Sequence, residues 1–318
     1  MSTLAQQPAS EEGKLPTWKR FWIYQGERFP LAAHGPLILA FSFCAVSISS
    51  RLRAGVWPHW PSVVVAFISC LLFFLQLRIA DEFKDNEEDT RYRPYRAVPR
   101  GLVRLWELGA LFVIACLIQA GMVLWWQPKL MILLLITWGY LAAMSVEFGR
   151  RDWLKARPIT YLWTHMLIMP LIDLYASSTD WMVAGHSAPP QGLIFFLAAS
   201  FFNGVVIEIG RKIRTPAQEE EGVETYSWLW GNRKAAVVWL GMVVITALFG
   251  CLTAWKVGAL GSVGAVLVTS ACGCGLFVLL FLKKQTDTRA KRFELAAGLW
   301  TLCLYLSLGI LPGVLAHG

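Results

Sequence analysis

Hydrophobic and polar positions form long alternating blocks along this chain. Apolar stretches of about 20 residues recur from end to end, and the charged residues lie mostly in the gaps between them. A stretch of this length can cross the hydrocarbon layer as a helix. The pattern predicts an all-α integral membrane protein with about nine transmembrane helices, at residues 33–50, 58–80, 102–125, 129–148, 158–178, 191–210, 234–254, 257–282 and 294–315.

Composition excludes several other classes of protein. Hydrophobic residues make up 56% of the 318 residues and charged residues only 16%, against about 25% charged in a soluble domain. All seven cysteines lie in apolar stretches, where single thiols behave as small hydrophobes, so we expect no disulfide framework. The net charge of +8 comes from basic residues that flank apolar segments. Membrane topology explains this charge, and we expect no nucleic-acid partner.

The distribution of Lys and Arg predicts the orientation in the membrane. Residues 1–32 and the loops after the second, fourth, sixth and eighth spans hold 4, 7, 4, 5 and 5 of them, 25 in all, whereas the other side holds 4. Basic loops stay in the cytoplasm. We therefore expect a multi-pass protein of the cytoplasmic (inner) membrane, with residues 1–32 as a cytoplasmic segment, residues 33–318 as the membrane domain, and the C-terminus outside.

An acidic cluster follows the second predicted span. Asp81, Asp85 and Asp89 recur every four residues, so a continuing helix would place them on one face. Three carboxylates on one face repel each other. A divalent cation relieves this repulsion, and oxygen ligands of this kind suit Mg²⁺, which completes its shell with water and substrate phosphates.

An arginine-rich segment comes directly after these carboxylates. Arg91, Arg93, Arg96 and Arg100 lie within ten residues, and guanidinium groups match phosphate oxygens bidentately. An acidic face followed by arginines is the pattern that binding of a diphosphate requires. The alternative is a solvated, charge-balanced loop that only sets topology.

These residues resemble the UbiA superfamily of intramembrane prenyltransferases. That family carries an N/D-D-x-x-D-x-x-x-D motif at the end of its second helix, and residues 81–89 fit it with Glu82 in place of the second Asp. Residues 96–101 fit the family's R-P-x-P-x-G turn, except for Ala97. The resemblance runs from about Arg28 to the C-terminus. It implies a UbiA-like bundle of helices around a central cavity, with Mg²⁺ bound by Asp81, Glu82, Asp85 and Asp89.

The second acidic motif of that family is altered here. Gly222, Thr225 and Gly231 keep the family's downstream spacing, but the expected aspartate pair is absent. Arg211 and Lys212 lie in this stretch, and Glu208 and Glu219 are the remaining candidates for a second metal. Cations facing the substrate can neutralise part of a diphosphate; the alternative is a loop that has lost catalysis and only keeps the fold.

Three further arginines and one histidine are considered as residues of the site. Arg150 and Arg151 resemble a basic pair that the family places near the diphosphate, although positive-inside topology explains them equally well. Arg28 can reach the same pocket from the first helix. His165, in the fifth predicted span, is interpreted as a packing residue.

The function that the resemblance implies is a Mg²⁺-dependent prenyltransferase. It would ionise a prenyl diphosphate and transfer the prenyl group, within the lipid bilayer, to a lipophilic acceptor such as an aromatic molecule. The expected catalytic residues are Asp81, Asp85, Asp89, Arg211 and Lys212, and the expected diphosphate ligands are Arg28, Arg93, Arg96, Arg150, Arg151, Arg211 and Lys212. Two alternatives stay open: a terpene cyclase that ionises the same substrate without an acceptor, and a non-catalytic transport or scaffold protein on the same frame.

Overall fold

The structure is a computed structural model that describes residues 11–220 and 222–315. Within these ranges the regular elements are all helical. The α-helices are α1 (Thr17–Arg28), α2 (Leu31–Ala54), α3 (Trp60–Lys84), α4 (Asn86–Tyr92), α5 (Leu105–Trp126), α6 (Met131–Ser145), α7 (Arg151–Lys155), α8 (Pro158–Met166), α9 (Ile168–Trp181), α10 (Leu193–Gly210), α11 (Tyr226–Trp230), α12 (Asn232–Lys256), α13 (Leu260–Lys283) and α14 (Asp287–Leu315). The prediction of an all-α membrane protein is confirmed.

Eight helices in the described residues are long and apolar enough to cross a membrane. They correspond to eight of the nine predicted spans, with α6 extended at its start by a 3-10 turn, Pro128–Leu130. The fifth predicted span, residues 158–178, folds instead as two shorter helices, α8 and α9, which follow one another with only Leu167 between them. Pro170 explains the break. In a continuous helix its ring would clash with the carbonyl of residue 166, and proline has no backbone N–H to donate to that carbonyl.

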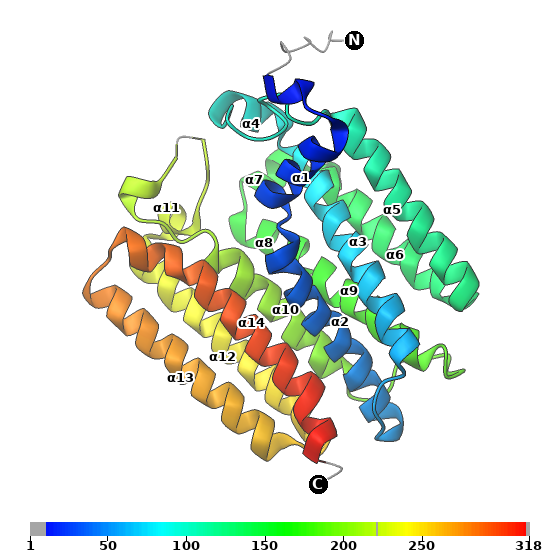
Figure 1. The fold of residues 1–318 in the computed structure, drawn as a ribbon. Coiled ribbons are helices and arrows are strands. Elements are labelled where there is room, and N and C mark those ends of the chain that lie inside the picture. Colours follow the sequence, from blue (N-terminus) through cyan, green and yellow to red (C-terminus); the bar gives the residue numbers. More distant parts are fainter. Residues whose placement is uncertain (1–10, 221, 316–318) are drawn as a thin grey trace.

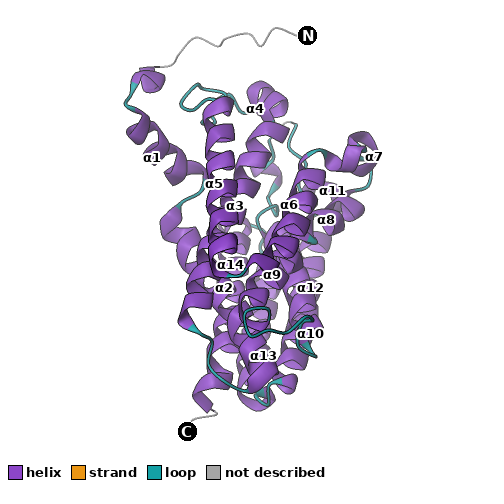
Figure 2. Ribbon diagram, turned by 90° about the vertical axis from the view of Figure 1, so that its right-hand side faces the viewer, coloured by secondary structure: helices purple, strands orange, loops and turns teal. Residues whose placement is uncertain are grey.

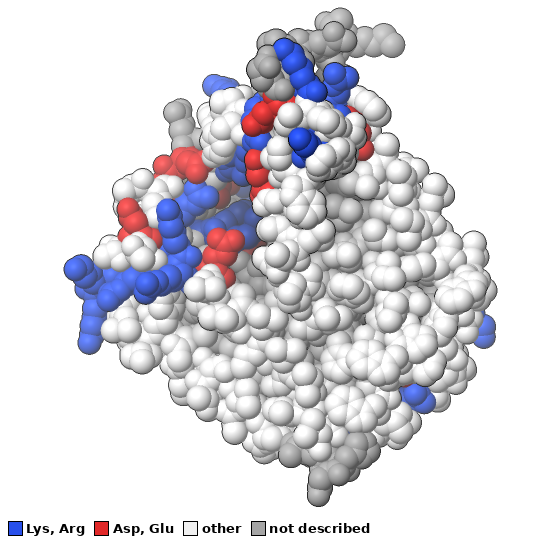
Figure 3. All heavy atoms as spheres, in the orientation of Figure 1, with Lys and Arg blue, Asp and Glu red and all other residues white. Residues whose placement is uncertain are grey.

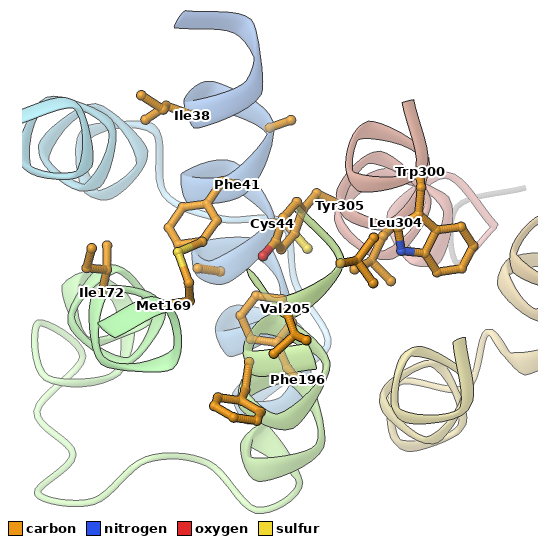
Figure 4. Packing of buried hydrophobic residues seen from close by; sticks show 14 of the residues in the cluster. Ile38, Phe41, Cys44, Met169, Ile172, Phe196, Val205, Trp300, Leu304 and Tyr305 are labelled. Carbon is orange, nitrogen blue, oxygen red and sulfur yellow. The ribbon is translucent and has the colours of Figure 1, made fainter. Parts of the chain in front are cut away.

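The middle of the bundle is formed by α2, α3, α9, α10 and α14. Helix α2 packs on α3, α9 and α14, and α10 packs on α9, α12 and α14. Figure 4 shows buried side chains from four of these helices converging, among them Phe41 of α2, Met169 of α9, Phe196 of α10 and Tyr305 of α14. Helices α5 and α13 are the least buried of the candidate spans, so they form the outer, lipid-facing part of the bundle.

Short helices gather at one end of the bundle. Figures 1 and 2 both place α1, α4, α7 and α11 at the end opposite to the C-terminal end of α14. All four lie outside the candidate spans, or at their ends. This end of the bundle therefore holds these four short helices, which lie outside the membrane spans.

The polar sequence of residues 1–32 does not predict helix α1; residues 1–10 lie outside the described residues. The guanidinium of Arg20 donates to both carboxylate oxygens of Glu107 in α5, at 3.0 and 2.5 Å, and to the backbone oxygen of Leu102 at 3.1 Å. Tyr24 of α1 is buried in a hydrophobic cluster with Leu102 and Val103. These contacts hold α1 over the turn that precedes α5.

Candidate functional site

A cavity of about 750 Å³ opens at the end where the short helices gather. Figure 3 shows Lys, Arg, Asp and Glu side chains concentrated at this end, on the face that it draws, while most of the remaining surface is uncharged. Charged side chains make up much of the cavity lining, together with the apolar side chains of Leu77, Met144, Met166, Ile168 and Met169. Leu77 and Met144 precede Asp81 and Glu147 by about one turn in the candidate spans α3 and α6, so we call these apolar residues the floor of the cavity. A charged rim above an apolar floor suits an amphiphilic ligand that has an anionic head.

The three aspartates of the first motif lie together on the cavity wall. Helix α3 ends at Lys84 and α4 begins at Asn86, yet the helical hydrogen bonds continue across the junction. The amide of Asp85 donates to the oxygen of Asp81 at 2.9 Å, and the amide of Asp89 to that of Asp85 at 2.8 Å. The four-residue repeat therefore brings all three carboxylates to the cavity.

Their surroundings differ. Asp89 is buried and accepts from Arg96 Nη1 at 2.6 Å and from Arg93 Nη1 at 3.4 Å. Asp85 makes no side-chain hydrogen bond or ion pair with a described residue; burial raises the pKa of Asp85, Lys84 lowers it, and Asp81 and Asp89 raise it further. A nearby cation would relieve this crowding of carboxylates.

These residues fit Mg²⁺ only in part as they stand. In the described part of the chain, no group of three or more His, Cys, Asp or Glu side chains is close enough together to hold a metal ion. Mg²⁺ is commonly held by one or two carboxylates and completed by phosphate and water. Asp81 and Asp85 can supply those carboxylates, while Asp89 is occupied by two arginines.

The altered second motif faces the same cavity. Glu208, at the end of α10, binds Arg211 Nε at 2.5 Å and Lys212 Nζ at 2.9 Å. Its carboxylate charge is the main reason why the pKa of Arg211 is raised. Glu208, Arg211 and Lys212 all line the cavity, so the structure brings these three residues together with the first motif.

Glu82 and Arg28 lie outside this cavity. Glu82 is buried, and its carboxylate binds Arg28 Nε at 2.5 Å and Arg78 Nη2 at 3.3 Å. Arg28 lines a separate hollow of about 420 Å³. Glu82 thus has the surroundings of a structural ion-pair partner, because both arginines bind its buried carboxylate.

Arg150 and Glu219 are not brought to the cavity either. Arg150 is exposed, whereas Arg151 lines the cavity and binds Glu88 of α4 at 3.2 Å. Glu219 accepts from the hydroxyls of Thr225 and Ser227, at 2.7 and 2.9 Å. The Glu219 carboxylate therefore secures the start of α11, and nothing places it beside Glu208.

A second polar group on the cavity wall was not predicted from the sequence. Glu147 follows α6 and is 3% exposed; its Oε1 accepts from the hydroxyl of Tyr161 at 3.2 Å and lies 3.4 Å from Lys84 Nζ. Lys84 in turn donates to the Tyr161 hydroxyl at 2.8 Å. His165, 6% exposed, places Nε2 3.2 Å from Glu147 Oε2. All four side chains line the cavity.

The backbone at Glu147 is unusual. Glu147 and Phe148 have φ values of 52° and 51°, the left-handed region that side-chain-bearing residues rarely adopt. Strain of this kind persists where the surrounding structure imposes it, and it clusters at functional sites. Burial alone would raise the pKa of Glu147, but His165, Lys84 and Tyr161 outweigh it and lower this pKa below its ordinary value. The carboxylate is therefore ionised at neutral pH.

The chain was compared with known proteins. The model of the UbiA prenyltransferase family matches residues 38–308, while no curated protein sequence matches the chain. The fold is similar to a solved structure of digeranylgeranylglyceryl phosphate synthase, with 13% sequence identity, 92% of this chain and 98% of that chain covered, and a TM-score of 0.61. Because the family model covers most of the sequence, the chain belongs to the UbiA prenyltransferase family.

Proposed function

We propose that this protein is a Mg²⁺-dependent intramembrane prenyltransferase that takes a prenyl diphosphate and transfers its prenyl group to a lipophilic acceptor. One observation carries the proposal. Asp81, Asp85 and Asp89 share a cavity with Arg211 and Lys212, directly above an apolar floor. The family and the fold support the same activity.

Charge balance supports the need for a metal. The described lining has nine Lys and Arg side chains and eight Asp and Glu side chains, so it is almost neutral. A diphosphate carries several negative charges, and the lining alone cannot neutralise them. Mg²⁺ on Asp81 and Asp85 would supply the missing positive charge and polarise the phosphoryl oxygens.

In this proposal the side chains of the protein bind the substrate and stabilise the leaving diphosphate. Arg93, Arg96, Arg211 and Lys212 donate to the diphosphate oxygens, and the prenyl chain lies along the apolar floor. As the allylic C–O bond breaks, the electron pair leaves with the diphosphate, and the arginines stabilise the charge that develops there. Arg93 and Arg96 must release Asp89 to do this, since both bind its carboxylate.

The test is a pyrophosphate-release assay on purified protein, with prenyl diphosphates from C10 to C20 and longer, with and without aromatic acceptors. Release of pyrophosphate together with a prenylated acceptor, identified by mass, supports the proposal. Release of pyrophosphate with a cyclised hydrocarbon and no acceptor consumed indicates a terpene cyclase, which the altered second motif also favours. No release with any donor contradicts both activities.

A further inference from the structure

The hollow beside Arg28 is lined mainly by arginines, and we call it the arginine hollow. It has a volume of about 420 Å³ and lies between α1, the turn after α4, and the loop between α10 and α11. Its described lining has five guanidinium groups and two carboxylates, an excess of three positive charges. The arginines are Arg28, Arg93, Arg96, Arg100 and Arg214. Such an excess favours binding of an anion.

Several guanidinium nitrogens in the arginine hollow are free to bind a ligand. Arg96 donates from Nη1 to Asp89 at 2.6 Å, and Arg28 donates from Nε to Glu82 at 2.5 Å. Nε and Nη2 of Arg96, and Nη1 of Arg28, have no hydrogen-bond partner among the described residues, and none of these three atoms is buried. Arg214 likewise donates only from Nη1. Three arginines therefore offer accessible donors.

Both carboxylates of the lining are already occupied. Glu27 accepts from Arg100 Nη1 and Nη2, at 2.9 and 2.8 Å. Glu220 accepts from Arg214 Nη1 at 3.0 Å and lies 3.4 Å from Arg93 Nε. No carboxylate of the described lining is left to hold a metal ion. An anion here would bind the guanidinium groups directly, by charge-assisted hydrogen bonds.

The arginines are held in place instead of extending into water. Their side chains are only 12–31% exposed. Arg93, Arg96 and Arg100 lie on one turn, in which the amide of Arg96 donates to the oxygen of Arg93 and the amide of Arg100 to that of Arg96, both at 3.0 Å. Ala97 of this turn is buried in one hydrophobic cluster with Tyr24 of α1. The donors are therefore fixed before a ligand binds, which lowers the entropy cost of binding.

The charge and shape of the arginine hollow suit a phosphate group. Burial and the charge of Arg96 lower the pKa of Arg93, whereas Asp89 and Glu220 raise it. An anion relieves this crowding of cations. A phosphate monoester carries roughly −1.5 to −2 charges at neutral pH and has three strong acceptor oxygens, which guanidinium groups match bidentately. A carboxylate offers one charge and two oxygens, so it satisfies fewer of these donors.

We propose that the arginine hollow is a phosphate-binding site that needs no metal, separate from the diphosphate site on the aspartates. Its ligand is a phosphate monoester, either of a soluble molecule or of a lipid headgroup. Arg28 ends α1 just before the candidate span α2 begins at Leu31, so the hollow lies at the membrane boundary, where both sources are present. The inference does not depend on the proposed function, because it requires neither Mg²⁺ nor turnover.

The experiment measures binding to the full chain in phosphatidylcholine nanodiscs, with EDTA in place of Mg²⁺. The soluble probe is glycerol 3-phosphate, titrated by calorimetry. The lipid probe is phosphatidic acid added to the nanodiscs, and the phosphatidic acid that stays on the protein after transfer to detergent is counted by mass spectrometry. A parallel titration of geranylgeranyl thiodiphosphate, a donor analogue that resists ionisation, is done with Mg²⁺ and reports on the aspartate cavity.

We expect metal-free, saturable binding of at least one probe, both in the wild type and in Asp85→Ala. Arg214→Gln should weaken binding of glycerol 3-phosphate about tenfold, the loss of one charged hydrogen bond, or lower the retained phosphatidic acid, and Arg214→Lys should recover part of either. Binding of the thiodiphosphate should not change, because Arg214 does not line the aspartate cavity. The matched control, Arg233→Gln, removes an exposed arginine outside both cavities and should bind like the wild type.

The outcomes identify the source of the phosphate and test the site. Binding of glycerol 3-phosphate that persists beside phosphatidic acid indicates a soluble ligand, and Arg214-dependent retention of phosphatidic acid that blocks glycerol 3-phosphate indicates a lipid. No metal-free binding of either probe overturns the inference, and so does binding that Arg214→Gln leaves unchanged or that Arg233→Gln reduces equally. A parallel loss of thiodiphosphate binding in Arg214→Gln indicates a structural role and also overturns it.

These results are independent of the proposed function. A protein that binds the phosphate probes but releases no pyrophosphate with Mg²⁺ and any donor loses the proposed function alone. A protein that releases pyrophosphate but binds neither probe without metal loses only the phosphate site.

Discussion

Arg211 and Lys212 share one carboxylate, Glu208, on the cavity wall. The sequence allows two interpretations of this loop. Either Arg211 and Lys212 replace a second Mg²⁺, or Glu208 and Glu219 bind one. The structure favours the cations, because Glu219 is bonded to hydroxyls at the start of α11. Glu208 then orients the two cations toward the cavity.

Replacing either cation should weaken binding of the diphosphate head. In Arg211→Gln or Lys212→Gln we expect a loss of about 1.5–3 kcal/mol for each charged hydrogen bond removed. Titration of geranylgeranyl thiodiphosphate measures it. The control is Arg233→Gln, at an exposed position outside the cavity. The opposite account holds if Glu208→Ala greatly raises the Mg²⁺ concentration for half-maximal rate while both cation variants keep their affinity.

At the scale of elements, α4 and the loop between α10 and α11 are tied together over the cavity. The carboxylate of Glu220 lies 3.4 Å from Arg93 Nε and 3.0 Å from Arg214 Nη1. Gly222, in the same loop, has a φ of 74°, and a Cβ there would lie 2.7 Å from the ring of Tyr92 in α4. This close approach requires glycine, both for the backbone and for the space.

Gly222→Val should therefore detach the loop from α4. We expect faster hydrogen exchange in α4 and in residues 216–224, together with weaker binding of the thiodiphosphate. Gly258→Val is the matched control, because Gly258 has a similar φ of 73° but nothing within 4 Å of a Cβ. Each variant should lose about 1–2 kcal/mol from the left-handed backbone, but only Gly222→Val should alter α4. Equal rates of hydrogen exchange in α4 of both variants would refute this contact between the loop and α4.

Local patterns were readable from the sequence, and contacts between distant segments were not. The aspartates at 81, 85 and 89 could be placed on one face because a helix repeats locally. The Lys84–Glu147–Tyr161–His165 group joins residues up to 81 positions apart, so no spacing reveals it. The sequence favours His165 as a packing residue; its Nδ1 is bonded locally to the backbone oxygen of Tyr161, but its Nε2 lies 3.2 Å from Glu147 Oε2. The sequence feature that could have indicated this group is Glu147, an isolated acidic residue at the end of the fourth predicted span.

At the scale of the whole molecule, charge is concentrated at one end of the bundle (Figure 3). From the count of 25 Lys and Arg on one predicted side against 4 on the other, we propose that this end, with the cavity, lies in the cytoplasm. A water-soluble diphosphate head would then reach the cavity from the cytoplasm, while the prenyl chain enters from the bilayer.

Reporter fusions test this orientation. A periplasmic-type phosphatase fused after residue 318 should be active, and a fluorescent protein that folds only in the cytoplasm should be dark there. The same two reporters in the loop between α12 and α13 should behave alike, and those in the loop between α10 and α11 should give the reverse. A dark phosphatase and a bright fluorescent protein at the C-terminus would show the opposite topology.

The most direct test of the central claim is pyrophosphate release by Asp85→Ala beside the wild type, at saturating Mg²⁺. Asp85 lies between the other two aspartates and has no side-chain bond to a described residue, so its removal should spare the fold. We predict release by the wild type that is lost without Mg²⁺, little or none by Asp85→Ala, and wild-type release by Asp152→Ala. Wild-type turnover in a folded Asp85→Ala protein would contradict the account of this cavity.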